Sequence, residues 1–288
     1  MKHYRTLEIA GVSKLLNQKS IIIIGGGIAG SEAAWQIARK GMKVSLIEMR
    51  PNVTTPAHNT SNLAELVCSN SLGSDSFGNA SGVLKEELRT YNSLIMRCAE
   101  ASRIPAGSAL AVERDKFSRL VSLYIKRSPN ISLHRKEISK IPEHRPCIIA
   151  TGPLTSLNLS ESISHLTGED NLYFYDAVAP IVTMESLDMT RLFWGSRYGR
   201  GGDDYLNCPM NEKEYNHFYE ALIFAETVKI REFEDIKVFE ACMPIETLAQ
   251  RGYKSLAFGP LRPVGLINPH TGERPFAVVQ LRPENIGR

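Results

Sequence analysis

The stretch Ser20–Glu48, SIIIIGGGIAGSEAAWQIARKGMKVSLIE, decides the fold of this chain. It begins with four consecutive isoleucines, which predict a strand buried on both faces. Glycines at the G-x-G-x-x-G spacing follow at once, in the six residues Gly25, Gly26, Gly27, Ile28, Ala29 and Gly30. Apolar residues at helical spacing then lead to Gly41, a helix stop, and to a second apolar strand at 44–47. The order predicts a Rossmann-like α/β unit that binds a dinucleotide.

Each glycine of the fingerprint has a different expected task. Gly25 lets the chain turn tightly out of the strand, Gly27 lets a pyrophosphate approach the backbone, and Gly30 lets the helix pack close to the sheet. Glu48 closes the second strand 18 residues beyond Gly30, near the ~20-residue offset at which an acid reaches a ribose hydroxyl. Such an acid suits the adenosine ribose of FAD or of NAD and disfavours a 2′-phosphate. A turn that is glycine-rich for structural reasons alone is the alternative.

Composition is that of a globular protein, with 43% hydrophobic and 23% charged residues among 288. No apolar run approaches the ~20 residues that span a bilayer, so no membrane is expected. Residues 1–19 lack the apolar core of a signal peptide, and we interpret them as a leader. The cysteines are dispersed, without metal-ligand spacing, which predicts no metal site and reduced thiols in the cytoplasm. They are Cys68, Cys98, Cys147, Cys208 and Cys242.

Charge is uneven along the chain. Residues 1–150 carry 21 Lys and Arg against 12 Asp and Glu, a net +9, whereas 151–288 carry 13 against 19, a net −6. The last part, 251–288, is basic again, with 6 against 2. Binding of a polyanionic partner would explain this pattern, and so would charged surfaces that contact only water.

Further elements follow from periodicity, and they predict two domains. Helices are expected over 83–101, 114–125 and 211–228, and strands over 131–133, within 146–152, and over 179–184, 205–207, 238–239 and 276–281. The strand in PCIIATG (146–152) ends in small residues, which favours a flavoprotein of the two-dinucleotide-binding type over a plain NAD dehydrogenase. We therefore expect an FAD-binding domain over 20–158 and an α+β insertion or substrate domain over 159–288.

Two cysteines have contexts that favour chemistry. Cys68 precedes a glycine-rich loop in ELVCSNS, and Cys242 ends a predicted strand in FEACMPIE. A thiol attacks as the thiolate, so such positions matter if nearby cations lower the pKa. The alternative for either residue is a small buried hydrophobe. Cys98 on an apolar helix face and Cys147 inside a strand are predicted core residues.

Longer sequence words now match a known family. The chain contains the following sequence motifs, in this order: GGGIAGSEAAW, EMRP, TPAHNT, ELVCSNS, PAGSALAVERDKFS, ATGP, YLNCPM, FEACMPIE, FGPLRPVGL and RPFAVVQLR. Together they closely resemble the folate- and FAD-dependent tRNA (uracil-5-)-methyltransferase family, TrmFO, which is related to the GidA-type tRNA modification flavoproteins. The resemblance runs from about Ile21 to the end of the chain.

The resemblance implies an activity and roles for named residues. Gly25–Gly30 would hold the FAD pyrophosphate, Cys242 would add to C6 of the target uracil, and Cys68 would be the second functional thiol near the flavin. Methylenetetrahydrofolate would supply carbon for 5-methyluridine in the T-loop of tRNA, with NADH or NADPH as reductant. Basic residues could contact RNA phosphates or be plain surface charges: Arg197, Arg251, Lys254, Arg262 and Arg274.

Other readings of the same residues remain open. They are a 23S rRNA uracil-5 methyltransferase, a GidA-like tRNA-modifying flavoprotein, an oxidoreductase for a small molecule, and an inactive remnant that keeps nucleotide or RNA binding. Known family members continue through a C-terminal stretch that returns to the flavin domain, and this stretch is absent from the 288 residues. We therefore expect the chain alone to bind the adenosine end of FAD. Its site for the flavin ring would be incomplete, and the chain alone would be inactive.

Overall fold

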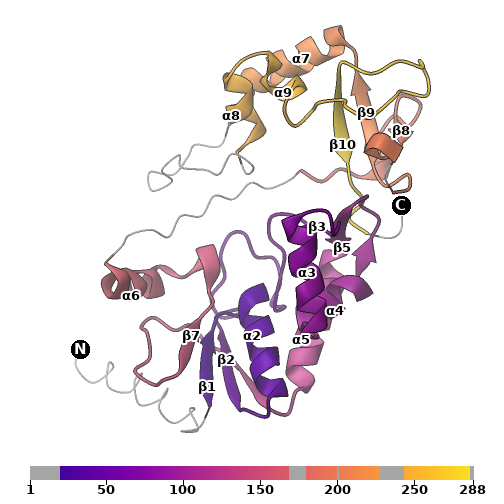
Figure 1. Ribbon diagram of the computed structural model, residues 1–288. Helices are drawn as coiled ribbons and strands as arrows, with labels where there is room; N and C mark the ends of the chain where they lie inside the picture. Colours follow the sequence, from indigo (N-terminus) through magenta and orange to yellow (C-terminus); the bar gives the residue numbers. More distant parts are fainter. Residues whose placement is uncertain (1–19, 169–179, 200, 228–242, 286–288) are drawn as a thin grey trace. The chain divides into compact units, whose positions relative to one another are not determined.

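The computed structural model describes residues 20–168, 180–199, 201–227 and 243–285. Contacts divide the chain into two compact units (Figure 1). The described residues of the first unit fall within 1–67, 86–102 and 114–174, and those of the second within 68–85, 103–113 and 175–288. The predicted leader 1–19 lies outside the described residues, and the functional division after residue 158 stays a prediction.

The first unit is built on a parallel sheet of four strands, in the order β6-β2-β1-β7. Its elements are β1 (Ile21–Ile24), α2 (Ile28–Arg39), β2 (Val44–Glu48), α4 (Leu94–Ala101), α5 (Arg114–Arg127), β6 (Ile131–Arg135), β7 (Cys147–Ile149) and α6 (Leu157–Thr167). Each parallel neighbour is reached through a crossover, as parallel pairing requires. The α/β class and the Rossmann-like unit predicted from Ser20–Glu48 are confirmed.

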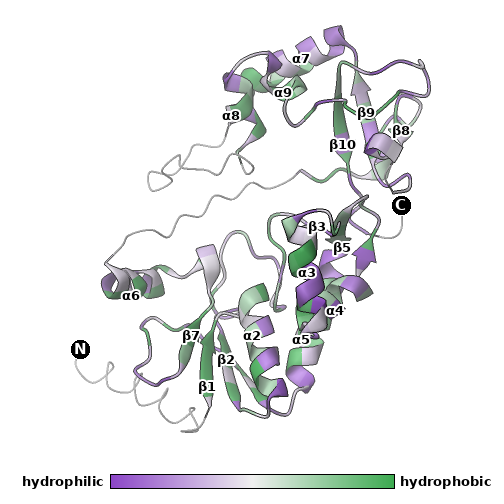
Figure 2. Cartoon of the chain, in the orientation of Figure 1, coloured by the Kyte–Doolittle hydropathy of each residue, from purple (hydrophilic) through white to green (hydrophobic). Residues whose placement is uncertain are grey.

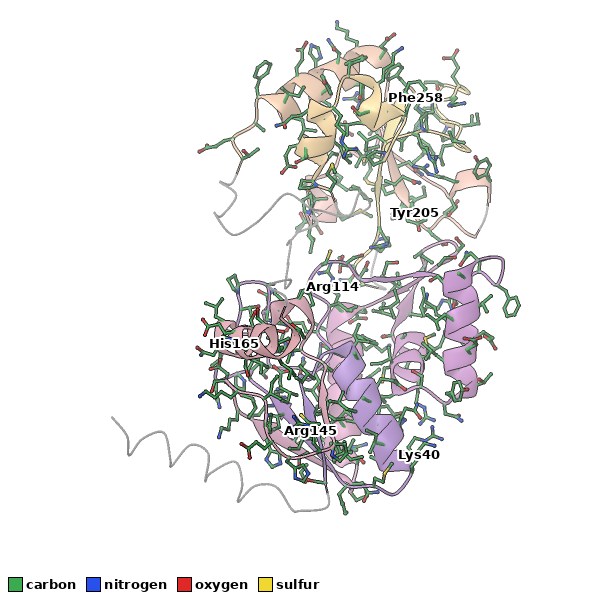
Figure 3. The ribbon with its side chains drawn as sticks, turned by 60° about the vertical axis from the view of Figure 1, so that its left-hand side comes forward. Lys40, Arg114, Arg145, His165, Tyr205 and Phe258 are labelled. Carbon is green, nitrogen blue, oxygen red and sulfur yellow. The ribbon has the colours of Figure 1, made fainter. Side chains whose placement is uncertain are left out.

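Burial explains why these residues form these strands. Ile22, Ile23 and Leu46 have no exposed surface, because the sheet is covered on both faces. The hydropathy colouring shows β1 hydrophobic along its length (Figure 2). In α2, Ala34 and Ala38 are buried, so small side chains let the helix lie close to the sheet. The helix ends at Arg39 with Lys40, labelled in Figure 3, as its C-cap.

The single helix predicted over 83–101 is wrong. The structure has two helices there, α3 (Ala80–Thr90) and α4. Between them Asn92 takes a left-handed conformation with φ 53°, and Ser93 caps α4 by accepting a hydrogen bond from the Met96 amide at 3.1 Å. The apolar spacing continues across the break and conceals it. The pair Asn-Ser before Leu94 is the sequence signal for a new helix start.

The second unit contains two antiparallel sheets, in the orders β3-β5-β4 and β10-β9-β8. Its elements are β3 (Ser71–Ser74), the start of α3, β4 (Arg103–Ile104), β5 (Ala109–Val112), β8 (Phe193–Trp194), β9 (Leu206–Met210), α7 (Glu212–Ile223), α8 (Ile245–Gln250), α9 (Lys254–Ala257) and β10 (Ala277–Leu281). Antiparallel strands with separate helices agree with the α+β character predicted for the later part of the chain. Tyr205, labelled in Figure 3, donates its hydroxyl to the Ala106 carbonyl at 2.8 Å, and so links the two sheets.

Tyr215 is the centre of the core beneath α7. It is fully buried and packs with Leu256 and Ala277. The ring centroid of Tyr253 lies 5.2 Å from that of Tyr215, edge-on, and that of Phe276 lies 5.1 Å away in a tilted arrangement. This core holds the helices of the unit against the β9–β10 pair.

Four sequence expectations for this unit have different outcomes. The strand expected over 179–184 is wrong for its described part, because Ile181 is 68% exposed, has no partner strand, and is followed by a 3-10 turn, η2 (Met184–Ser186). The helix expected over 211–228 ends earlier, at Ile223. The strand expected at Val238–Phe239 lies outside the described residues, whereas the strand over 276–281 is confirmed as β10.

Within the described residues, no helix is both long and apolar enough to cross a membrane.

Candidate functional site

A pocket of about 270 Å³ lies in the first unit, where β1 and β2 end. The glycine turn forms one side of it, the end of β2 a second, and the residues after β7 a third. The lining includes Gly25–Ala29, Glu48–Arg50, His58, Glu65, Lys136–Ile138 and Ala150–Ser156. Ligands of parallel α/β sheets bind at this carboxyl edge.

The three glycines of the fingerprint are required for separate steric reasons. Gly25 has φ +101°, and a Cβ there would lie 2.5 Å from the Ala150 carbonyl oxygen. A Cβ at Gly30 would lie 1.9 Å from the carbonyl oxygen of Gly25, so only glycine lets α2 approach the turn. At Gly27 a Cβ would meet nothing within 4 Å. The space beside Gly27 is therefore open on the pocket side, as a pyrophosphate needs.

Gly26 has a role that the sequence did not reveal. A Cβ there would lie 2.5 Å from Cδ2 of Leu63 and 2.8 Å from Oε2 of Glu48. The middle glycine of the run thus lets the turn contact the end of β2. The backbone amide of Gly26 uses this closeness to donate a hydrogen bond to Glu48 Oε2 at 2.7 Å.

Helix α2 starts directly at the pocket. Gly27 is its N-cap and provides no side-chain hydrogen bond, and the first turn holds no acidic residue. The amides of Ile28, Ala29 and Gly30 therefore have no intrahelical acceptor. Backbone donors at a helix N-terminus, together with the helix dipole, attract an anion such as a phosphate group.

Glu48 is 5% exposed and is held as an ionised acceptor. Its Oε1 accepts from the Arg50 amide at 3.0 Å and from Arg50 Nε at 2.9 Å, while Oε2 accepts from Gly26. Burial by itself would raise the pKa of this carboxyl, but the hydrogen bonds and charge of Arg50 outweigh it, so the pKa is lowered. A carboxylate has about four acceptor positions, and three are filled here. One position on Oε2 is left for a ribose hydroxyl.

Arg50 is a residue of the site that the sequence analysis missed. Its side chain is 2% exposed and bridges two carboxylates, Glu48 at 2.9 Å and Glu65 at 2.8 Å. Glu65 also accepts from the amides of Asn59 and Thr60 at 2.8 and 3.2 Å. Arg50 thereby ties the loop after β2 to the strand end. The two-residue spacing of Glu48 and Arg50, which puts both side chains on one face of an extended chain, was the available signal.

His58 lines the same pocket. Its Nδ1 lies 2.8 Å from the Thr55 hydroxyl, which fixes the ring. Burial lowers the pKa of His58, and the charge of Arg50 lowers it further against the opposing effect of Glu65. The imidazole is therefore neutral at pH 7, so it adds a hydrogen-bonding ring and no charge to the pocket wall.

The cysteines fall into different settings. Cys68 is exposed, belongs to the second unit, and does not line the pocket. Cys242 lies outside the described residues. Cys98 is buried, and burial raises the pKa of its thiol to about 12, so this thiol is inert. Burial also raises the pKa of Cys147, which packs against the core beside β1 and β2. The predicted core positions of Cys98 and Cys147 are confirmed.

The basic residues singled out from the sequence all lie in the second unit. Arg197 is half-buried, whereas Arg251, Lys254, Arg262 and Arg274 are exposed. Among the described residues, no group of three or more His, Cys, Asp or Glu side chains could hold a metal ion.

Comparison with known proteins agrees with the geometry of the pocket. The model of the family "Glucose inhibited division protein A" (GIDA) matches residues 20–288. Three curated relatives are named methylenetetrahydrofolate--tRNA-(uracil-5-)-methyltransferase TrmFO, from Moorella thermoacetica, Aquifex aeolicus and Heliobacterium modesticaldum. They are 60%, 56% and 59% identical over 92–93% of this chain. The chain spans 60–61% of their length.

Among solved structures, GidA of Aquifex aeolicus matches 47% of this chain and 25% of its own, with a TM-score of 0.38 and 15% identity. A likeness of this size carries no argument about function.

Proposed function

Because the chain belongs to the glucose inhibited division protein A family, we propose that it carries the FAD-binding and base-activating residues of a folate-dependent tRNA (uracil-5-)-methyltransferase. One observation carries the proposal: identity of 54–60% with TrmFO relatives extends over 92% of the chain. The aligned region therefore includes the glycine turn and the segments around Cys68 and Cys242.

The pocket of the first unit fits the ADP half of FAD. The open space at Gly27 and the amides at the start of α2 suit the pyrophosphate, and the remaining acceptor of Glu48 suits the adenosine ribose. Arg50 is held by Glu48 and Glu65, so this cluster carries a net negative charge and disfavours a 2′-phosphate. When bound and reduced by NADH or NADPH, the flavin supplies the hydride of the reaction.

The thiols supply covalent catalysis in this proposal. Uracil C5 is a weak carbon nucleophile at pH 7, so addition of the Cys242 thiolate to C6 is needed to place a carbanion at C5. That carbon bonds to the methylene carbon supplied by methylenetetrahydrofolate. Loss of the C5 proton to a base then breaks the C–N bond that carried the methylene, and a hydride would convert the methylene to methyl. Cys242 is expelled as the C5–C6 double bond re-forms. Cys68 is the second functional thiol in this proposal. The uridine lies in the folded T-loop, so the base must leave its stack to reach Cys242. Because tRNA is the substrate, we place the protein in the cytoplasm.

Replacing Cys242 by alanine is expected to lower methyl transfer about a thousandfold or more, as the loss of a covalent nucleophile does. The measurement is label transfer from methylenetetrahydrofolate to unmodified tRNA, with FAD and NADPH or NADH present. Cys208→Ala is the matched control, because Cys208 is half-buried in β9 and burial raises its pKa. Equal labelling above background by Cys242→Ala and wild type would overturn the nucleophile assignment. Label that enters 23S rRNA and not tRNA would overturn the substrate.

A further inference from the structure

Tyr198, in the second unit, is an exposed aromatic residue in a strained backbone conformation. It has φ 58° and ψ 21° inside the turn η3 (Arg197–Gly199). A bulky residue rarely adopts the left-handed region, so this conformation is strained. Its amide donates to the Gly265 carbonyl at 2.8 Å, which holds the turn in place. Yet the side chain remains 63% exposed, so core packing does not explain the strain.

Gly265 provides the surface on which this ring rests. A Cβ at Gly265 would lie 2.9 Å from both Cγ and Cδ2 of Tyr198, and Gly265 itself has φ +78°. Any other residue there would displace the ring. The pair of unusual conformations therefore presents the ring in one fixed position, with most of its surface in water.

Arg197 precedes Tyr198 in the sequence, and hydrogen bonds hold its side chain in place. Its Nε donates to Gln280 Oε1 at 2.7 Å, and Gln280 donates in turn to Asn207 Oδ1 at 2.9 Å. Asn207 is fully buried and donates to backbone carbonyls of 193 and 195 at 3.2 and 3.0 Å. This chain of hydrogen bonds orients the guanidinium through Nε and leaves its two Nη groups for another partner.

Arg262 brings a second positive charge to Arg197. Burial lowers the pKa of Arg197, and the nearby charge of Arg262, three residues before Gly265, lowers it further. In the described part of the chain neither forms an ion pair with a carboxylate. Two cations kept together without an acidic partner repel each other, and an anion that binds both removes the repulsion.

We infer that Tyr198, Arg197 and Arg262 form a subsite for one nucleotide of an RNA chain. The base stacks on the Tyr198 ring, and the adjoining phosphate binds the two guanidiniums. Base stacking on aromatic rings and phosphate contacts by arginine are the two contacts by which unpaired RNA is held. The inference deepens the proposed function, because it rests on RNA as the substrate of this chain.

The test is fluorescence anisotropy of a labelled T-arm stem-loop RNA with the full chain. Tyr198→Ala is expected to weaken binding about fivefold to 150-fold, which corresponds to the ~1–3 kcal/mol of one base stack. Tyr198→Phe keeps the ring and should bind as wild type does. Arg262→Gln should lower the slope of log affinity against log salt by nearly one, since about one counterion fewer is released.

Lys213→Gln is the matched control, because Lys213 is also exposed in the same unit, on α7 and outside this cluster. The factor by which this control weakens RNA binding should be at least two times smaller than the factor for Arg262→Gln. Equal RNA affinity for Tyr198→Ala and wild type would overturn the inference, as would a loss confined to binding of tetrahydrofolate. Methyl transfer assayed in parallel separates the two proposals: RNA binding with the expected pattern but without methyl transfer contradicts only the proposed function.

Discussion

Gly27→Val is expected to lower the affinity of the chain for ADP and FAD about a hundredfold or more, equivalent to about 2.7 kcal/mol, while the protein stays folded. A Cβ at Gly27 meets no protein atom within 4 Å, so the fold has room for the side chain. The same space is the one we assign to the pyrophosphate. A β-branched residue there blocks the approach to the amides of α2. Isothermal titration calorimetry with ADP measures the loss.

Gly41→Ala is the control for this variant. Gly41 follows the other end of α2 with φ +80°, so alanine there costs about 1 kcal/mol of strain. Valine in place of the N-cap Gly27 costs a similar amount. The two variants should therefore melt at similar temperatures, but only Gly27→Val should lose ADP. Undiminished ADP binding by Gly27→Val would show that the pyrophosphate lies elsewhere.

Arg50→Met is expected to lower the free energy of unfolding by about 3–5 kcal/mol, the usual cost of breaking a buried ion pair by removing one partner. Methionine fills much of the volume but leaves Glu48 and Glu65, whose side chains are 6% and 10% exposed, without their cation. The measurement is urea unfolding at pH 7. Arg39→Met removes an exposed arginine that bonds only to backbone carbonyls of 91 and 92, and should cost about 1 kcal/mol or less.

The stability of Arg50→Met at low pH distinguishes the loss of this ion pair from a packing defect. The pKa of Glu48 is lowered in the folded state, so its pairing stabilises the protein above the ordinary value of 4.5. That contribution disappears as the pH falls through the lowered pKa. The stability difference between wild type and Arg50→Met should therefore narrow below about pH 4.5. A difference that stays constant down to pH 3 would identify a cavity, not a lost charge pair, as its cause.

The glycine turn could be predicted from the sequence because its constraints are local. Gly25 and Gly30 touch each other, and Glu48 closes the next strand, so spacing along the chain already encodes their positions. The partnership of Arg50 with Glu65 could not be predicted in the same way. It joins residues 15 apart through a loop without periodicity, and only the folded chain shows that both are buried.

The Tyr198 subsite was also beyond prediction from the sequence. It depends on backbone conformations at Tyr198 and Gly265, which are 67 residues apart in the sequence and are joined by a backbone hydrogen bond at 2.8 Å. Arg197 and Arg262 had been grouped with three other basic residues by charge alone. What distinguishes them is the Gln280–Asn207 support of Arg197, which follows from the pairing of β9 with β10, and the lack of an ion pair with a carboxylate in the described chain.

The central claim is that the turn after β1 anchors a dinucleotide through its ADP half. The most direct test is titration of the ¹⁵N-labelled protein with ADP, followed by amide chemical shifts. The account predicts that the largest shifts occur at the amides of Gly27, Ile28, Ala29 and Gly30, with a smaller change at Gly26, which bonds to Glu48. Saturating ADP that leaves these amides unmoved, or that moves mainly the amides around Tyr198, would contradict it.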